Sequence, residues 1–258
     1  MLKGLYTAYT GMIHEQKRLD TMTNNLANAS TVGFKKEGTT SEAFEDILAY
    51  KLKDSSVGLA AIQQNGWNNP GVKIGENYTD YSQGSFRATD NVYDLALSGE
   101  GFFAVEFTNK AGETSTKYTR DGSFTLTQEG YLATKDGDFV LDAQNRRIRL
   151  NANSETEIDQ EGYLIQNNLR VAQIQVADFE DYDYLEKYGE NYYQPAEGAV
   201  LADSSATVNS GYLEMANVNT VAEMVNLIAI TRAYEANQKI LQAYDSGLDI
   251  AVNQLGKL

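Results

Sequence analysis

Near the N-terminus, apolar side chains recur three or four residues apart, which is the spacing of one face of a helix. These seam residues are Leu5, Tyr9, Met12, Leu19 and Leu26, with polar Gln16 and Thr23 at the two remaining positions. Asn24, Asn25 and Asn28 then accumulate before a Ser-Thr-Val-Gly run, and such residues favour helix ends and turns. We therefore predict a helix that ends near Asn28.

The last fifty residues carry a longer stripe of the same kind. It consists of Leu227, Ile230, Tyr234, Asn237, Leu241, Tyr244, Leu248, Ala251 and Leu255. Thr220 to Glu223 matches a capping box, so we place the start of this helix there. A straight helix drifts off a seven-residue repeat, so a stripe of about four heptads indicates a partner helix beside it. The N-terminal helix is the obvious candidate.

The segment after the first helix carries weaker signals. Thr39 to Glu42 also matches a capping box, and Phe44, Ile47, Leu48 and Lys51 then predict a short amphipathic helix to about Leu52. Residues 55–75 mix Gly, Asn, Gln and Pro70 without a sustained period. We expect an irregular connection there.

Between about Tyr78 and Thr207 the pattern changes to short β-rich runs separated by Gly and Asp, which indicates an antiparallel β domain. The runs are Gly101–Phe107, Ser123–Thr127, Arg146–Leu150 and Arg170–Ala177. Gln128–Leu132 recurs as Gln160–Leu164, and Gly84–Phe86 as Gly122–Phe124, an internal echo that favours hairpins.

Together these patterns predict an α+β fold. The N- and C-terminal helices pair as a coiled-coil-like stem, and the antiparallel β-rich domain is inserted between them. The predicted organisation is an N-terminal helix and short second helix over 1–54, an irregular connection over 55–77, the β domain over 78–208 and the C-terminal helix over 209–258. An ordinary helical hairpin that covers the β domain is the alternative. A two-helix stem leaves one side of each helix open, so we expect self-association.

Charge and composition exclude several partners. The chain has a net charge of −15, and the segment between Ser56 and Asn209 holds 11 Lys/Arg against 24 Asp/Glu. Nucleic acid and anionic lipid headgroups require clustered cations, so we expect neither as a partner. The chain has no cysteine and no apolar run of about 18 residues, so we expect no thiolate site and no membrane insertion. Polar residues interrupt the first 19 positions, so we also expect no cleaved secretory signal.

No arrangement of residues indicates an enzyme or a cofactor. The single histidine, His14, flanks the stripe of the first helix and is expected to be structural. Gly99-Glu-Gly101 begins like a phosphate loop but continues into a strand-like run, so it favours a tight turn. The acidic residues around Asp178 and Asp183 lack the glycine and the closing glutamate of a calcium loop. We expect no catalytic, cofactor-binding or metal-binding residues.

Several blocks of sequence resemble the flagellar rod and hook proteins. Asn24–Lys35 is similar to the signature that closes the first helix in that family, and Tyr212–Asn219 with Arg232–Lys239 is similar to its C-terminal helix. Asp94–Phe103 and Thr119–Phe124 extend the resemblance into the middle. One departure is Ala216, where the family commonly has Ser.

The resemblance implies an exported subunit of the flagellar basal body that assembles with copies of itself and with neighbouring rod or hook subunits. It also implies passage through the flagellar export apparatus, and the length suggests a proximal or distal rod subunit. A hook-type subunit, a glycan-directed domain on a secreted coiled-coil stem, and a secreted adhesin or effector are the alternatives. The expected assembly residues are Leu5, Tyr9, Met12, Leu19, Asn25, Leu26, Asn28, Gly33, Phe34, Leu227, Ile230, Tyr234, Leu241, Tyr244 and Leu248.

Overall fold

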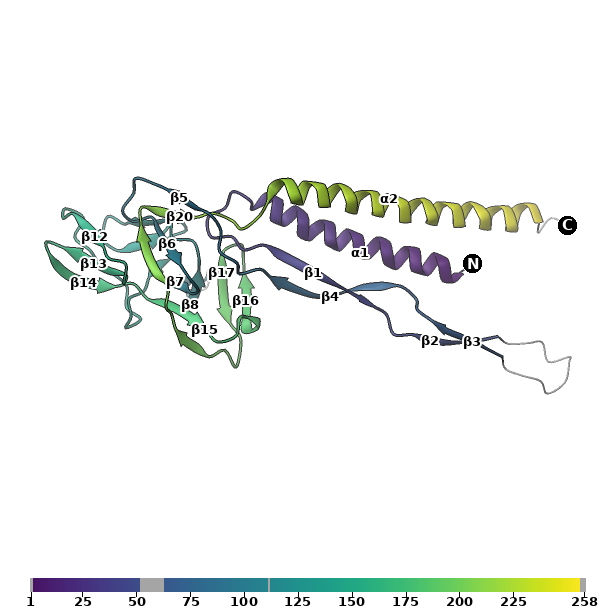
Figure 1. Cartoon of the computed structure of the whole chain (residues 1–258), viewed down its shortest axis with the longest axis horizontal. Helices are drawn as coiled ribbons and strands as arrows, with labels where there is room; N and C mark the ends of the chain where they lie inside the picture. Colours follow the sequence, from purple (N-terminus) through teal and green to yellow (C-terminus); the bar gives the residue numbers. More distant parts are fainter. Residues whose placement is uncertain (1, 52–62, 111, 256–258) are drawn as a thin grey trace. The chain divides into compact units, whose positions relative to one another are not determined.

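The computed structural model describes residues 2–51, 63–110 and 112–255, which form an α+β protein (Figure 1). The chain groups into two compact units. The helical unit consists of Met1–Ala27, Glu37–Asp80 and Asn219–Leu258, and the β unit consists of Asn28–Lys36 and Tyr81–Val218. The predicted partition therefore needs revision, because residues 37–80 group with the helices and residues 28–36 group with the strands.

Two long helices form the first part of the helical unit. Helix α1 spans Leu2–Ala27, so it ends where the asparagines predict. Helix α2 spans Thr220–Ile250 and continues as a π-helical turn, Ala251–Leu255. Its cap is Asn219, whose side chain accepts the N–H of Ala222 at 3.1 Å. The predicted capping box is thus displaced by one residue, because Asn219 has the extended backbone that an N-cap needs.

Helices α1 and α2 lie side by side and run antiparallel (Figure 1). Two glycines of α1 allow close approach. A Cβ added to Gly4 would lie 2.2 Å from the Tyr244 hydroxyl oxygen, and one added to Gly11 would lie 3.0 Å from Nδ2 of Asn237. Gly11 follows Gly4 by seven residues on α1, and its neighbour Asn237 precedes Tyr244 by seven residues on α2, as antiparallel helices require. Small residues of α1 therefore lie against large residues of the predicted α2 stripe.

The predicted short helix after α1 is wrong, since this segment forms two strands. Strand β1 (Glu37–Ala43) pairs with β4 (Val72–Thr79), and β2 (Ile47–Lys51) pairs with β3 (Gln63–Asn68), both antiparallel. A helix of this length is marginal in isolation, whereas a distant strand supplies a full row of backbone partners. The irregular connection expected over 55–77 is likewise wrong from residue 63 onward, and residues 55–62 lie outside the described residues.

Helix α1 contacts the β1–β4 ladder through polar side chains. Nε2 of His14, which is 5% exposed, lies 2.8 Å from the Ser41 hydroxyl. The buried Asn25 side chain bonds both backbone groups of Glu37, donating to its carbonyl at 2.8 Å and accepting from its N–H at 2.9 Å. Asn25 therefore holds the beginning of β1 rather than the end of its own helix.

The β unit contains only antiparallel pairs among its described strands. A nine-stranded sheet has the order β16-β17-β8-β7-β11-β10-β9, with β15 also paired to β7 and β18 paired to β15. A three-stranded sheet, β12-β13-β14, and the pairs β6–β19 and β5–β20 complete the unit. The bounds are β5 Phe86–Ala88, β6 Leu95–Ser98, β7 Phe102–Thr108, β8 Thr114–Thr119, β9 Phe124–Leu126, β10 Leu132–Thr134, β11 Phe139–Val140, β12 Thr156–Ile158, β13 Tyr163–Gln166, β14 Leu169–Gln173, β15 Val176–Phe179, β16 Leu185–Tyr188, β17 Tyr192–Pro195, β18 Leu201–Asp203, β19 Thr207–Ser210 and β20 Tyr212–Glu214, with a short 3₁₀ helix at Tyr182–Tyr184.

Strand β7 separates two hydrophobic clusters. Phe103 and Val105 enter one cluster, whereas Phe102 and Ala104 enter the other. Successive side chains of a strand point to opposite faces, so a strand buried on both faces is a continuous apolar run. This explains the uninterrupted apolar pattern that predicted the strand.

Of the other predicted strands, one matches a single strand of the structure and the others differ from it. Ser123–Thr127 contains β9, but Arg170–Ala177 spans parts of two strands, β14 and β15. Arg146–Leu150 forms isolated bridges, with Arg147 opposite Leu141 and Arg149 opposite Tyr131. Asn209 to Val218, expected to begin the C-terminal helix, instead contains the end of β19 and all of β20.

The repeated Gln-Glu-Gly-Tyr-Leu sequence forms two similar hairpins, as predicted. Gly130 lies in the turn between β9 and β10, and Gly162 lies in the turn between β12 and β13. Their φ angles are 85° and 79°, and each N–H donates to the carbonyl three residues earlier at 2.9 Å. Glycine suits these turns because other residues rarely adopt such angles.

We predict that Asn25→Ala destabilises the helical unit by roughly 1–3 kcal/mol, because two backbone groups of Glu37 lose their partner. Urea unfolding followed by circular dichroism measures the loss. Asn226→Ala, at an exposed position of α2, is the matched control and should change the free energy of unfolding by less than about 0.5 kcal/mol. Equal stability of the two variants would show that these bonds contribute nothing.

Candidate functional site

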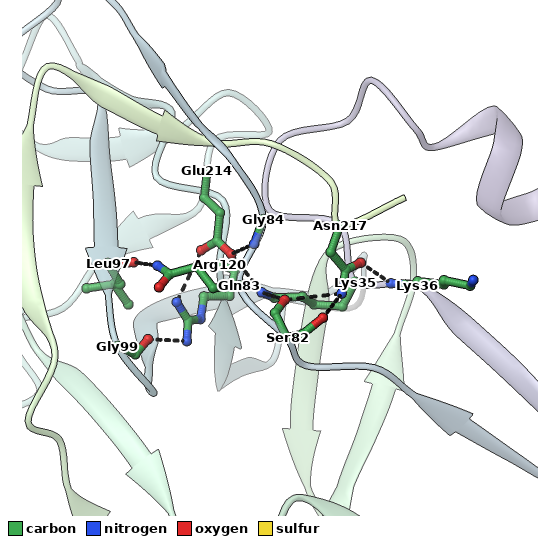
Figure 2. A network of polar contacts seen from close by, with 10 residues as sticks. All are labelled: Lys35, Lys36, Ser82, Gln83, Gly84, Leu97, Gly99, Arg120, Glu214 and Asn217. Carbon is green, nitrogen blue, oxygen red and sulfur yellow. Dashed lines mark hydrogen bonds and ion pairs between the residues drawn. The ribbon is translucent and has the colours of Figure 1, made fainter. Parts of the chain in front are cut away.

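Segments from four blocks singled out in the sequence meet inside the β unit (Figure 2). Lys35 ends the first block, Gly99 belongs to the second, Arg120 to the third and Glu214 to the fourth. The charged side chains are buried, with exposures of 1% for Lys35, 4% for Arg120 and 1% for Glu214. We call these three residues the ion cluster.

The Glu214 carboxylate is the centre of the ion cluster. One oxygen accepts from Nζ of Lys35 at 2.7 Å and from the N–H of Gly84 at 2.9 Å. The other oxygen accepts from Nη1 of Arg120 at 3.1 Å. Three donors, two of them cationic, thus surround one buried anion.

The two cations also bind backbone carbonyls. Nζ of Lys35 donates to the Ser82 carbonyl at 2.8 Å, and Nη2 of Arg120 donates to the Gly99 carbonyl at 2.7 Å (Figure 2). Asn217 extends the network, since its side chain accepts the N–H of Lys36 at 2.7 Å and donates to Ser82 at 3.1 Å. The cluster therefore joins backbone segments that lie far apart in the sequence.

The chain segments around the ion cluster can pack this closely because Gly33 has no side chain. Its φ is 70°, and an added Cβ would lie 2.4 Å from the backbone nitrogen of Asp121. Its N–H donates to the Glu214 carbonyl at 2.8 Å. Any side chain at Gly33 would separate the segment after α1 from the segments that carry Arg120 and Glu214.

Four of the expected assembly residues lie where α1 ends. Gly33 and Phe34 are buried in the β unit, and the Phe34 ring lies 4.2 Å from Nζ of Lys187. Asn28 is also buried there, and its side-chain oxygen accepts the Thr31 hydroxyl at 3.1 Å. Asn25 lies in the helical unit.

The remaining expected residues lie along the two helices, and their side chains range from buried to exposed. On α1, Tyr9 is 47% exposed, whereas Leu5, Met12, Leu19 and Leu26 are half-buried. On α2, Ile230 is buried at 3%, Leu248 is 37% exposed, and Leu227, Tyr234, Leu241 and Tyr244 are half-buried. One copy of the chain therefore leaves much of both stripes accessible.

The sequence analysis does not predict the ion cluster, although each member lies within a block that carries the family resemblance. One local pattern indicates that such a charge is buried, namely a charged residue directly after apolar or turn-forming residues. Lys35 follows Gly33-Phe34 in this way, and Glu214 follows Leu213. Pairing could not be inferred, because Glu214 lies 179 positions from Lys35 and 94 from Arg120.

A cavity of about 420 Å³ lies beside the cluster, lined in part by Arg120, Phe102, Tyr81 and Tyr182. The Tyr182 hydroxyl donates to Asp178 at 2.7 Å, and burial with this bond raises the pKa of Tyr182. Asp181 caps the 3₁₀ helix through the N–H of Asp183 at 2.9 Å. Two acidic side chains of this segment, Asp178 and Asp181, thus accept hydrogen bonds from the protein itself. The described residues hold no group of three or more side chains suited to a metal ion.

These features define the class of protein: an α+β protein whose buried charges bind one another and hold separate chain segments together. Within the described residues no helix is both long and apolar enough to cross a membrane. Gly99 and Gly101 have φ angles of 112° and 138° and lie in the turn between β6 and β7, so the glycine pair forms a turn as predicted.

Three regions of the chain, one at each end and one in the middle, match models of flagellar rod and hook proteins. Residues 5–35 match the model described as flagella basal body rod protein, and residues 96–180 match the D1 domain of the flagellar hook protein FlgE/F/G. Residues 209–255 match the C-terminal part of the flagellar basal body rod FlgEFG protein. Each matched region supplies one member of the ion cluster.

Whole-length relatives give the same result. The flagellar basal-body rod protein FlgF of Mesorhizobium japonicum is 32% identical over 99% of both chains. In Bacillus subtilis, FlgG is 30% identical over 98% of this chain and 99% of its own length, and the hook-basal body complex protein FlhO is 30% identical over all of both chains. The chain belongs to the flagellar basal-body rod protein family.

We predict that Glu214→Gln destabilises the β unit by about 3–5 kcal/mol, because two buried cations lose their counter-charge. The urea midpoint of unfolding reports this change. Glu186→Gln at an exposed strand position is the matched control and should leave the midpoint unchanged. If both variants unfold at the same urea concentration, the cluster does not hold the unit together.

Proposed function

We propose that this chain is a structural subunit of the flagellar basal-body rod that self-assembles through α1 and α2 into the axial tube that transmits torque. The observation that carries the proposal is the match to proteins named as basal-body rod proteins, which extends over nearly the whole length of both chains. The partners are copies of the chain and neighbouring rod or hook subunits. The chain reaches the basal body through the flagellar export apparatus.

The antiparallel helices support a coiled-coil-like stem as the assembling element. Gly4 and Gly11 on α1 meet Tyr244 and Asn237 on α2, and the seven-residue interval on both helices is the repeat of a coiled coil. The proposed assembly surface comprises the seam residues of both stripes. Asn25, Asn28, Gly33 and Phe34 support it by fixing the chain where α1 ends.

Burial energetics favour assembly over an isolated subunit. Most seam residues are half-buried in one copy, and Tyr9 and Leu248 are exposed. Burying a large apolar side chain fully contributes roughly 1.5–3 kcal/mol, so further neighbours along a tube stabilise each helix pair.

The family name supports a structural role rather than catalysis, and the ion cluster agrees with it. The Glu214 carboxylate is buried and accepts bonds from three protein groups, so it holds the chain in place. A hook-type subunit is the second candidate, because the matched D1 model is named for the hook protein.

We predict that Leu241→Asp prevents incorporation into basal bodies while the β unit stays folded, because a charge enters the helical seam. Immunoblots of purified basal bodies measure incorporation, and limited proteolysis reports whether the β unit persists. Gln242→Asp adds the same charge at the neighbouring exposed position and should be incorporated normally. Normal motility and normal basal bodies with Leu241→Asp would contradict the packing proposal.

A further inference from the structure

Helix α2 carries a second apolar stripe that its own unit does not cover. The stripe consists of Val221, Met224, Val225 and Ile228, with exposures of 70%, 51%, 61% and 52%. Their spacing places them on one helix face. At about 100° per residue this face lies roughly 140° around the helix from Leu227 and Ile230. Single exposed apolar residues are ordinary, but a contiguous stripe marks an interaction surface.

A groove of about 260 Å³ lies on another surface of the same unit, between α1 and the β1–β4 ladder. Its apolar lining includes Tyr6, Tyr9, Ile13, Phe44, Val72 and Ile74. Among the polar groups of the lining, His14 bonds Ser41 and the Thr10 hydroxyl donates to the Thr7 carbonyl. Lys73 pairs with Glu42 at 3.1 Å, and Lys17 also borders the groove. The lining is mainly apolar, and the groove is small enough to suit inserted side chains rather than a large ligand.

We propose that the α2 stripe of one copy inserts into the α1–β4 groove of the next copy. This inference rests on the proposed function, because a rod subunit meets other copies of itself. Stripe and groove are different surfaces of the same chain, so the contact is heterologous. Heterologous contacts do not close into a two-fold dimer and instead propagate into rings or helical tubes, which is the assembly that a rod requires.

The positions of the two surfaces also predict the offset between copies. The contacts of Gly4 with Tyr244 and of Gly11 with Asn237 fix the level of α2 along α1. Continuing this antiparallel register places the stripe beside roughly residues 20–27 of α1, whereas the groove lies beside residues 6–17. The centres differ by about 12 residues, or about 18 Å at 1.5 Å per residue. A neighbouring copy with a parallel axis is thus displaced by about 18 Å along it.

Disulfide trapping tests the contact directly, because the chain has no cysteine of its own. Copies with Ile228→Cys are co-expressed in flagellated cells with differently tagged copies carrying Val72→Cys, and basal bodies are purified and oxidised. We expect a covalent dimer that carries both tags. Val200→Cys, at a similarly exposed position of the β unit, replaces Ile228→Cys in the control and should give none. Absence of the mixed dimer, or an equal yield from Ile228→Cys alone, would overturn the proposal.

A charge in the stripe gives an independent readout. We expect Ile228→Glu to lower incorporation into basal bodies by at least about tenfold, with unchanged helix content, because its side chain is half exposed in the free subunit. Val72→Glu should act likewise, and Val200→Glu should not. Normal incorporation of Ile228→Glu would overturn this inference alone, whereas absence of the unaltered chain from basal bodies would overturn the proposed function itself.

Discussion

Two buried cations share the carboxylate of Glu214, and the geometry of the β unit depends on that arrangement. Lys35 follows α1 in the sequence, Arg120 lies in the centre of the chain, and Glu214 precedes α2. A carboxylate 1% exposed costs several kcal/mol to bury unless cations and N–H donors surround it, and here three donors do so. The segments can close around it because Gly33 and Gly84 have no side chain. An added Cβ would lie 2.4 Å from Asp121 and 1.9 Å from Met215, respectively.

The cluster takes one member from each of the three regions that match the rod and hook family models. The β unit is built from two stretches of chain, Asn28–Lys36 and Tyr81–Val218, which residues 37–80 of the helical unit separate in the sequence. Lys35 and Asn217 each bind the Ser82 carbonyl, which joins the incoming and outgoing segments to a third. Removal of the Glu214 carboxylate would leave the buried side chains of Lys35 and Arg120 without their shared counter-charge.

Much of the fold follows from local pattern, and the rest depends on distant partners. Asparagines and Gly33 predict the end of α1, the apolar stripe predicts α2, and the repeated Gln-Glu-Gly-Tyr-Leu sequence predicts hairpins, because each signal acts over a few residues. The pattern at Thr39–Glu42 predicts the start of a helix, but these residues form part of β1, because pairing with the distant β4 leaves no trace in the local sequence. The ion cluster is not predictable for the same reason, because no short-range pattern connects Lys35 with Glu214. The stripes predicted an accessible helical surface, but not which α1 residues lie against Tyr244.

If the chain is a required subunit of the rod, a strain that lacks it cannot complete the rod. Electron microscopy of its basal bodies should then show truncated rods without hooks, and normal structures once the unaltered chain is restored. Complete rods with hooks in the deletion strain would contradict it.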